Sequence, residues 1–490
     1  MKYIKKHAVL IFFLIEALVI GFFQTLGNTD RLWNYVFAEN IASGLLPYRD
    51  FNLLQTPFSC LVNAVFLTIF GHHMVVMDLL GAVLFTLICM RLFGLCRELG
   101  ATSVVSMIIP QVFLYLFCYN VFFEYSCLIL FLQLSLLSAD LMALRRQKAR
   151  WDRPLYQTAL GAAAGLAILS KQTYGLFVAG ASWLGCLYTS VCLKKSKKET
   201  GILLSARTVG IMLPCFCFLF YLLITGTFAD FWDMAVAGIS TFTSKYSYLE
   251  LAQESWGDLF ACVGAPILIF ASLILGVRRR KELYGQTLLV ILLYGAGGLI
   301  NLYPLANAYH FATTVIPFLL LIPALLPPSL WQKRPVCLLG GTAVAAALCF
   351  LVVHIPYDVT SGNHLCTTLD QYEGVFISNS TEEDILEVTA YVQDQQEDGM
   401  TVYILDNRAA SYFLPLHQYH KYYDMFLLGN LGTTSPQELL EEACQEDVIF
   451  LVPNSEKQEW QYPRSAVNAL KKELLYAGSV GDFDVYRTKG

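Results

Sequence analysis

Charged residues are scarce in this sequence: they make up 14% of its 490 residues, whereas 56% are hydrophobic. Soluble domains are about one quarter charged, so this composition excludes an ordinary soluble protein and indicates a polytopic membrane protein. Neither a Gly-x-Gly-x-x-Gly loop nor a P-loop occurs, so nucleotide binding has no support. No CxxC pair occurs among the 14 cysteines, so no zinc knuckle is expected.

The charges are divided unevenly along the chain. From Tyr357 onward there are 22 acidic and 8 basic residues, which leaves 16 acidic and 25 basic residues before it. So acidic a C-terminal part argues against nucleic acid as a partner. Most cysteines lie in apolar stretches, where they act as small hydrophobic residues. Only Cys366 and Cys444 lie in the polar part, and whether they form a disulfide is an open question.

Long apolar segments fill the chain before residue 356 and predict about eleven transmembrane helices. One further segment, 54–70, is short and contains Gln55, Pro57 and Asn63, so we expect it to lie flat at the outer interface. The predicted spans are 8–26, 74–95, 103–118, 121–144, 155–170, 173–193, 202–225, 258–277, 285–302, 311–329 and 335–353.

Basic residues beside membrane helices tend to stay in the cytoplasm, and they set the predicted topology. If all basic clusters are cytoplasmic, the chain must cross the membrane an even number of times between consecutive clusters. This condition is met only if segment 54–70 does not cross the membrane. The N-terminus is then cytoplasmic and the C-terminus is outside. The clusters are Lys2 to Lys6, Arg91 with Arg97, Arg145 to Arg153, Lys194 to Lys198, Arg278 to Lys281, and Lys333 with Arg334.

Residues 357–490 alternate like a small extracytoplasmic α/β domain that follows a transmembrane domain over 1–356. Ser380-Thr-Glu-Glu383 resembles a capping box and predicts a helix to about Gln396. Ser435-Pro436 predicts the start of a second helix. The expected strands are 401–405, 447–452 and 483–487.

Polar residues of an unusual kind gather in the predicted outer loop 27–73. Asp30 follows the first apolar helix closely, where a carboxylate is suited to act as general base towards a hydroxyl. The alternative is a helix-end acid that is solvated or paired with Arg31. Asp50, beside Tyr48 and Arg49, has the same two interpretations, since this stretch also reads as a simple turn before an amphipathic helix.

Three more polar residues stand at predicted outer helix ends. Glu124 opens a long apolar helix, and a carboxylate beside lipid is costly unless it is paired or functional. Lys171 lies in an outer turn and suits an anion such as a lipid phosphate, although it equally suits snorkelling to headgroups. His310 is expected to bind phosphate or sugar hydroxyls, or to be a hydrogen-bonded interfacial histidine.

As a set, these residues resemble the GT-C superfamily of membrane glycosyltransferases, of the protein O-mannosyltransferase and aminoarabinose transferase type. The resemblance covers the membrane part. It rests on an acid after the first helix, on Glu124 and His310 at outer helix ends, and on two motifs. These are the pattern Asp30, Tyr35, Ala38, Ile41, Gly44, Pro47-Tyr48, Asp50-Phe51, Pro57 and Phe70-Gly71, and the stretch Gly165-Leu-Ala-x-x-Ser-Lys171-Gln. Departures include Asp30-Arg31, where several relatives have Asp-Glu, and Glu124, where others have Asp.

The resemblance implies transfer of a sugar, with inversion, from a polyprenyl-phosphate donor to an extracytoplasmic acceptor. The acceptor would be a glycan, lipid or protein of the cell envelope. Asp30 is then the base. Arg31, Tyr48, Asp50, Glu124, Lys171 and His310 are substrate contacts, with Lys171 at the phosphate. A divalent cation is an open question, with Asp50 and Glu124 as its candidate ligands.

Two other classes compete with the enzyme. A transporter or lipid-linked-sugar flippase predicts internal repeats, broken helices and polar residues at the membrane midplane. The sequence has no clear repeat, and its unusual polar residues sit towards one face. The third class is a scaffold without activity that displays the acidic C-terminal part.

Overall fold

The computed structural model describes residues 2–146, 150–241, 246–444, 447–455 and 462–488. Two compact units make up the chain. We call the first the helical unit; it consists of Met1–Phe22, Asp78–Phe220 and Tyr246–Asp358. We call the second the mixed unit; it consists of Phe23–Met77, Tyr221–Lys245 and Val359–Gly490. A separate domain boundary at residues 356 and 357 stays a prediction.

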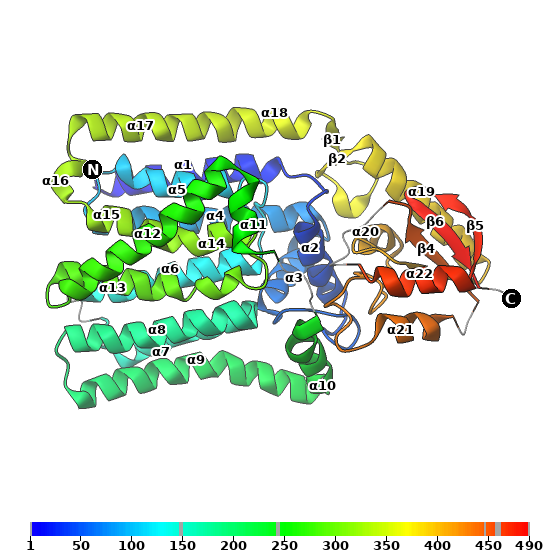
Figure 1. Ribbon diagram of the computed structural model, residues 1–490, viewed down its shortest axis with the longest axis horizontal. Coiled ribbons are helices and arrows are strands. Elements are labelled where there is room, and N and C mark those ends of the chain that lie inside the picture. Colours follow the sequence, from blue (N-terminus) through cyan, green and yellow to red (C-terminus); the bar gives the residue numbers. More distant parts are fainter. Residues whose placement is uncertain (1, 147–149, 242–245, 445–446, 456–461, 489–490) are drawn as a thin grey trace. The chain divides into compact units, whose positions relative to one another are not determined.

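Long helices dominate the helical unit, and their axes share one general direction (Figure 1). They are α1 (Lys2–Phe22), α4 (Met74–Glu98), α5 (Val105–Leu116), α6 (Tyr125–Arg146), α7 (Pro154–Ser170), α8 (Gln172–Cys192), α9 (Lys197–Thr225), α12 (Trp256–Arg278), α13 (Leu283–Ala296), α14 (Ala308–Leu319) and α17 (Arg334–Cys349). Shorter helices are α11 (Tyr248–Glu254), α15 (Leu321–Leu325), α16 (Pro328–Trp331) and α18 (Ile355–Thr360).

Among the described residues, seven helical segments are long and apolar enough to cross a membrane. They are α4, α6, α8, α9, α12, Ala308–Leu325 and Arg334–Thr360. The other four predicted spans are also helical: α1, α5 and α13 have shorter apolar stretches, and α7 is a helix of 17 residues. The multi-pass helical class is therefore confirmed, while the number eleven stays a prediction.

Large apolar side chains cover the surface of several of these helices. On α9, Leu213, Phe216 and Phe220 are exposed. A soluble protein rarely exposes so continuous an apolar surface, because each side chain would order water around it. Lipid tails remove that cost, so these faces are suited to contact a bilayer.

The mixed unit contains helices from the loop after α1 and from the C-terminal part. They are α2 (Thr29–Ala42), α3 (Phe58–Phe70), α10 (Phe228–Trp232), α19 (Asn379–Glu397), α20 (Ala410–Phe413), α21 (Pro436–Ala443) and α22 (Arg464–Glu473). α3 is the helix expected over 54–70. Brief 3₁₀ or π turns in both units are η1 (Asp233–Ala237), η2 (Gly238–Thr241), η3 (Leu299–Leu302), η4 (Phe350–His354), η5 (Asp370–Tyr372) and η6 (Leu414–Leu416).

A four-stranded sheet forms the core of the C-terminal part. Its strands are β3 (Thr401–Ile404), β4 (Val448–Pro453), β5 (Leu475–Val480) and β6 (Phe483–Arg487), in the order β3-β4-β6-β5. β3 and β4 are parallel, whereas β6 is antiparallel to both of its neighbours. β1 (Asn363–Leu365) and β2 (Phe376–Ser378) form a separate antiparallel pair. The small sheet domain predicted from the sequence is thus present.

One detail of this part differs from the prediction, and one question that the sequence left open is answered. The cap of α19 is Ser378, whose hydroxyl accepts a hydrogen bond from the Thr381 amide over 3.1 Å. Ser380 itself lies inside the helix, because the Ser378 side chain already satisfies the orphan donor of the first turn. Cys366 and Cys444 are both free cysteines; Cys366 is buried and Cys444 half-buried.

Candidate functional site

Asp30 lies in the first turn of α2 in the mixed unit. The Asn28 side chain starts this helix by accepting a hydrogen bond from the Arg31 amide over 3.1 Å. The N-terminal end of a helix carries partial positive charge, which stabilises a carboxylate in the first turn. The Asp30 residue is exposed. An anionic, accessible side chain is what a general base requires.

Arg31, the next residue, is buried. Its guanidinium Nη1 donates a hydrogen bond to the Thr25 carbonyl oxygen over 2.9 Å, which ties α2 to the chain that precedes it. This contact gives Arg31 a structural function at the start of α2.

Tyr48 and Asp50 occupy one tight turn after α2. Tyr48 has a positive φ of 72°, is fully buried, and donates from its hydroxyl to the Gln55 carbonyl oxygen over 2.7 Å. Asp50 accepts from the Leu46 amide and from Nε of Arg49, each over 2.8 Å. The hydrogen bond from Arg49 holds the pKa of the Asp50 carboxyl below its ordinary value. Both side chains shape the turn.

Glu124 is buried at the start of α6 in the helical unit. Its carboxylate accepts hydrogen bonds from the backbone amides of Ser126, over 2.6 Å, and Cys127. It also accepts from the Tyr309 hydroxyl over 2.6 Å. The sequence analysis singled out His310 but passed over Tyr309 beside it. These three donors stabilise the carboxylate as a helix cap without a cation.

Lys171 and His310 stand near this capped helix end. Lys171 Nζ lies 4.9 Å from the centre of the Tyr125 ring, the residue after Glu124. His310 Nδ1 lies 2.8 Å from the Leu305 carbonyl oxygen, which favours a proton on Nδ1. The structure therefore gathers Glu124, Lys171 and the Tyr309–His310 pair around the start of α6.

The candidate residues thus fall into two groups, one in each unit. Asp50 and Glu124, the two candidate metal ligands, belong to different units. Among the described residues, no group of three or more His, Cys, Asp or Glu side chains could hold a metal ion.

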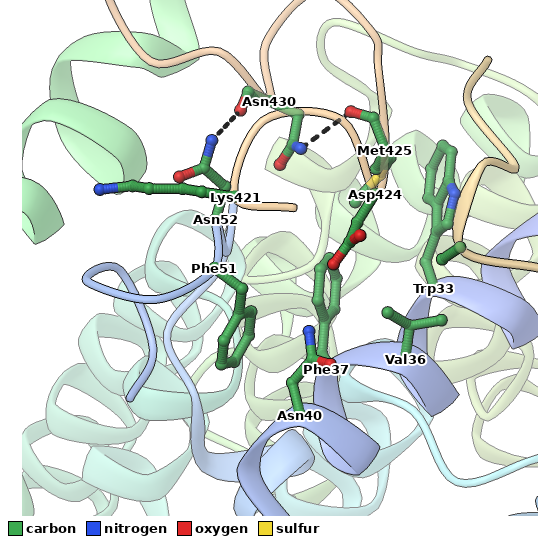
Figure 2. Close-up of a pocket in the computed structure, with 11 residues that line it drawn as sticks. Trp33, Val36, Phe37, Asn40, Phe51, Asn52, Lys421, Asp424, Met425 and Asn430 are labelled. Carbon is green, nitrogen blue, oxygen red and sulfur yellow. Dashed lines mark hydrogen bonds between the residues drawn. The ribbon is translucent and has the colours of Figure 1, made fainter. Parts of the chain in front are cut away.

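A small cavity in the mixed unit, with several buried polar residues in its wall, escaped the sequence analysis. Figure 2 shows its walls, which include Asn40 from α2, Asn52 from the following loop, and Asp424 and Asn430 from the C-terminal part. Asparagines are common in loops, so single residues of this kind give no signal in a sequence. Only the fold brings them together.

The comparisons with known proteins agree with this architecture. Residues 55–218 match the family model described as dolichyl-phosphate-mannose-protein mannosyltransferase. No curated protein matches the sequence.

Solved structures resemble the whole chain in fold. ArnT from Cupriavidus metallidurans bound to undecaprenyl phosphate gives a TM-score of 0.60 at 13% identity, with 97% of each chain covered. The apo state of ArnT gives 0.61 at 11% identity with the same coverage. AglB from Archaeoglobus fulgidus, an archaeal oligosaccharyltransferase, gives 0.50 at 14% identity, covering 92% of this chain and 70% of AglB.

The shared fold confirms the architecture predicted from the sequence. The family match over residues 55–218 is to a glycosyltransferase family, which agrees with the predicted class and leaves the sugar open.

Proposed function

We propose that the protein transfers a sugar from a polyprenyl-phosphate donor to a hydroxyl-bearing acceptor of the cell envelope. Asp30 takes the proton from the acceptor hydroxyl while the acceptor oxygen attacks the anomeric carbon. The bond between that carbon and the phosphate oxygen breaks, and the lipid phosphate leaves with the electron pair. A single displacement of this kind inverts the anomeric centre.

The observation that carries this proposal is the exposure of Asp30 at the start of α2. Of the other acids at predicted outer positions, Glu124 is buried and Asp50 is half-buried. An acid that must accept a proton from a substrate has to be reachable, and Asp30 meets that requirement.

Lys171 supplies the second chemical requirement, a cation for the departing phosphate. Neutralising charge that develops in the transition state is a large catalytic effect in acyl and phosphoryl chemistry, and the same physics applies here. The undecaprenyl phosphate bound to ArnT and the dolichol-phosphate bound to AglB support a lipid-phosphate donor for this chain. His310, Arg31, Tyr48, Asp50 and Glu124 would contact or position substrates.

The proposed topology places the N-terminus in the cytoplasm and residues 357–490 outside. A polyprenyl-phosphate sugar would then reach the protein from the lipid, while a polar acceptor would arrive from the aqueous side.

The test compares Asp30→Asn with Asp398→Asn, a matched change at an exposed acid that ends α19. Mass spectrometry would measure surface glycans and lipid-linked sugars in cells with each variant at equal membrane level. We expect Asp30→Asn to abolish transfer and to let the donor lipid accumulate, as in the deletion. Unchanged transfer in this variant would refute the role of Asp30.

The flippase alternative predicts a different result with purified protein in vesicles. A flippase moves a fluorescent polyprenyl-phosphate sugar between leaflets and leaves it intact, whereas a transferase releases polyprenyl phosphate only when acceptor is present. Movement without release would favour the flippase.

A further inference from the structure

A second cavity in the mixed unit lies beside the segment that carries Asp30. Its volume is about 140 Å³, roughly ten times the 10–15 Å³ that one water molecule needs. Gly27 and Leu32, on either side of Asp30 in the sequence, line one part of it. Residues of the C-terminal part line the rest, from the first turns of α19, from α20 and from the turn between β5 and β6. The cavity is thus large enough for a small organic ligand.

The chain itself limits the distance from this cavity to Asp30. Asp30 comes three residues after Gly27 and two residues before Leu32. Because an extended chain spans at most about 3.6 Å per residue, the Cα atom of Asp30 lies within about 11 Å of that of Gly27 and within about 7 Å of that of Leu32. A ligand held in the cavity therefore has Asp30 within reach of a neighbouring part of the same molecule.

The cavity combines an apolar interior with a polar opening. Leu26, Leu32 and Ile385 line it and are each at most 6% exposed. Ser380 and Asp482 line it as well, but both are exposed. Apolar side chains therefore form the inner surface, and polar side chains surround the opening.

Asp384 is held in one orientation in the wall by two donors. Its Oδ2 accepts from the Tyr412 hydroxyl over 2.6 Å, and its Oδ1 accepts from the Asp482 amide over 2.8 Å. The turn between β5 and β6 can approach so closely because Gly481 has a φ of 48° and lacks a Cβ atom, which would collide with the same carboxylate. Each carboxylate oxygen keeps a further lone pair, so Asp384 can still accept a hydrogen bond from a ligand.

Arg408 adds donors to the same cavity. Its side chain is 37% exposed, and its Nε lies 4.0 Å from Oδ1 of Asp406, which is too far for a hydrogen bond. Among the described residues, none accepts a hydrogen bond from this guanidinium, whose N–H groups form a fixed fork. The cavity thus presents donors from Arg408 and acceptors from Asp384.

We propose that this cavity binds one sugar ring of the acceptor, which makes the acceptor a glycan. The inference rests on the proposed function, because it names the class of the acceptor. A sugar ring has apolar C–H groups, which fit the buried leucines and Ile385. Its hydroxyl groups both donate and accept, which fits Asp384 and Arg408. A ring bound here places the adjoining sugar of the same glycan near Asp30, which takes the proton from its hydroxyl.

Other classes of ligand match these walls less well. A lipid tail offers no hydrogen bond to Asp384 or Arg408 and would cover both groups without a partner. A phosphate group would meet two aspartates and only one arginine, so repulsion opposes it. A peptide acceptor is commonly bound through its main chain at a sheet edge, and none of the lining residues belongs to a strand.

The test measures binding of simple sugars to the purified full-length protein. The protein is placed in lipid nanodiscs, because maltoside detergents carry sugars of their own. The probes are the methyl glycosides of glucose, galactose, mannose and N-acetylglucosamine, followed by saturation-transfer NMR. We expect at least one of them to bind with a dissociation constant of about 1–10 mM, as befits a small ligand with few contacts. If none of the four binds, the proposal is refuted.

Two variants show whether the sugar binds in this cavity. A Cβ atom at Gly27 meets only Thr25, at 3.9 Å, so Gly27→Trp should fill the cavity and abolish the signal. Arg408→Leu should weaken binding about tenfold or more, because charge-assisted hydrogen bonds are lost. Gly257→Trp adds the same side chain at an exposed glycine of α12 and should bind sugar like the wild type.

The midpoint of thermal unfolding shows which variants are folded. If Gly27→Trp is unstable, Arg408→Leu decides alone, since its side chain is half-buried and makes no hydrogen bond among the described residues. Equal binding by the wild type and by the folded cavity variants would mean that the sugar binds elsewhere, and would overturn the proposal.

These measurements use neither the donor nor the transfer reaction. Absence of sugar binding would overturn the glycan acceptor and leave the role of Asp30 standing. Unchanged transfer in Asp30→Asn would refute that role, although the cavity could still bind sugar. The two failures are therefore distinguishable.

Discussion

Arg207 and Asp140 form a fully buried ion pair in the helical unit: Nη2 of the arginine lies 3.0 Å from Oδ1 of the aspartate, and neither side chain is exposed. The pair links α9 to α6. Tyr294 and Trp151 complete the shell, donating to the Asp140 carboxylate over 2.6 and 2.9 Å. Gln157 accepts from Nε of Arg207 over 2.9 Å. Every charge in this network therefore has several partners.

Breaking this pair on one side should be strongly destabilising. Asp140→Leu leaves the buried charge of Arg207 uncompensated, and Arg207→Leu leaves that of Asp140 uncompensated, which costs about 3–5 kcal/mol in each case. The double variant Asp140→Leu with Arg207→Leu should lose less than the sum of the singles, because no lone charge remains. Thermal unfolding in detergent measures all three. Strict additivity would contradict the coupling.

This network shows what the sequence could not predict. Charges inside apolar segments are themselves a signal of a paired or functional site, but the sequence analysis passed over both Asp140 and Arg207. Their partnership could not be predicted, because the two residues are far apart in the sequence and are brought together only by the packing of α6 and α9. The same holds for the contact between Glu124 and Tyr309.

Local patterns were more reliable where a single element decides the structure. The strand at Phe483–Arg487 and the helix starting after Ser435 formed as predicted, since alternation and a proline at the first helical turn are local signals. β5 was missed because its side chains are mostly exposed and show no apolar alternation. α2 was missed as a helix because most of its residues are buried, including polar ones, which hides the amphipathic period.

Close contact between α7 and α9 gives the second prediction. A Cβ atom added to Gly161 would lie 2.1 Å from the Arg207 carbonyl oxygen, and one added to Gly210 would lie 2.1 Å from the Thr158 carbonyl oxygen. Because these obstacles are backbone atoms, Gly161→Ala or Gly210→Ala must push the helices apart. We expect each variant to lower the yield of folded protein and its unfolding midpoint.

Gly201, also on α9, is the matched control for this pair. A Cβ there meets no described atom within 4 Å. Gly201→Ala should leave stability unchanged or raise it by up to about 1 kcal/mol, since alanine favours the helix. If all three alanine variants behaved alike, the close approach would not limit packing.

Glu382 in α19 predicts a pH dependence. A hydrogen bond from the Thr368 hydroxyl, with further help from His364 at 2.6 Å, lowers the pKa of this carboxyl from its ordinary value of 4.5. A carboxyl with a lowered folded-state pKa stabilises the folded protein above its unfolded pKa, and that contribution is lost as the pH falls. The midpoint temperature of unfolding should therefore fall as the pH is lowered below about 4.5.

The comparison variants for this effect are neighbours on one helix. In Glu382→Gln the midpoint temperature should fall less as the pH is lowered. Glu383→Gln, at an exposed position, should have the same pH dependence as the wild type. Scanning calorimetry between about pH 2 and 7 gives the three curves. Identical curves for the wild type and Glu382→Gln would show that the contacts of Glu382 do not contribute.

Variants of Lys171 distinguish binding of the donor phosphate from simple contact with lipid headgroups. If its ammonium holds the donor phosphate, Lys171→Met loses a charge-assisted hydrogen bond of about 1.5–3 kcal/mol, which raises the KM for donor about 10- to 100-fold. Lys171→Arg should retain much of the affinity, because it keeps the charge. Tyr125→Phe keeps a ring beneath the ammonium, 4.9 Å away in the wild type, and is expected to behave like it. If Lys171 only contacts headgroups, Lys171→Met should leave the KM for donor unchanged, because the ammonium then interacts with bulk lipid and not with the donor. Transfer kinetics at varied donor concentration, with folded yield measured in parallel, distinguish these two roles.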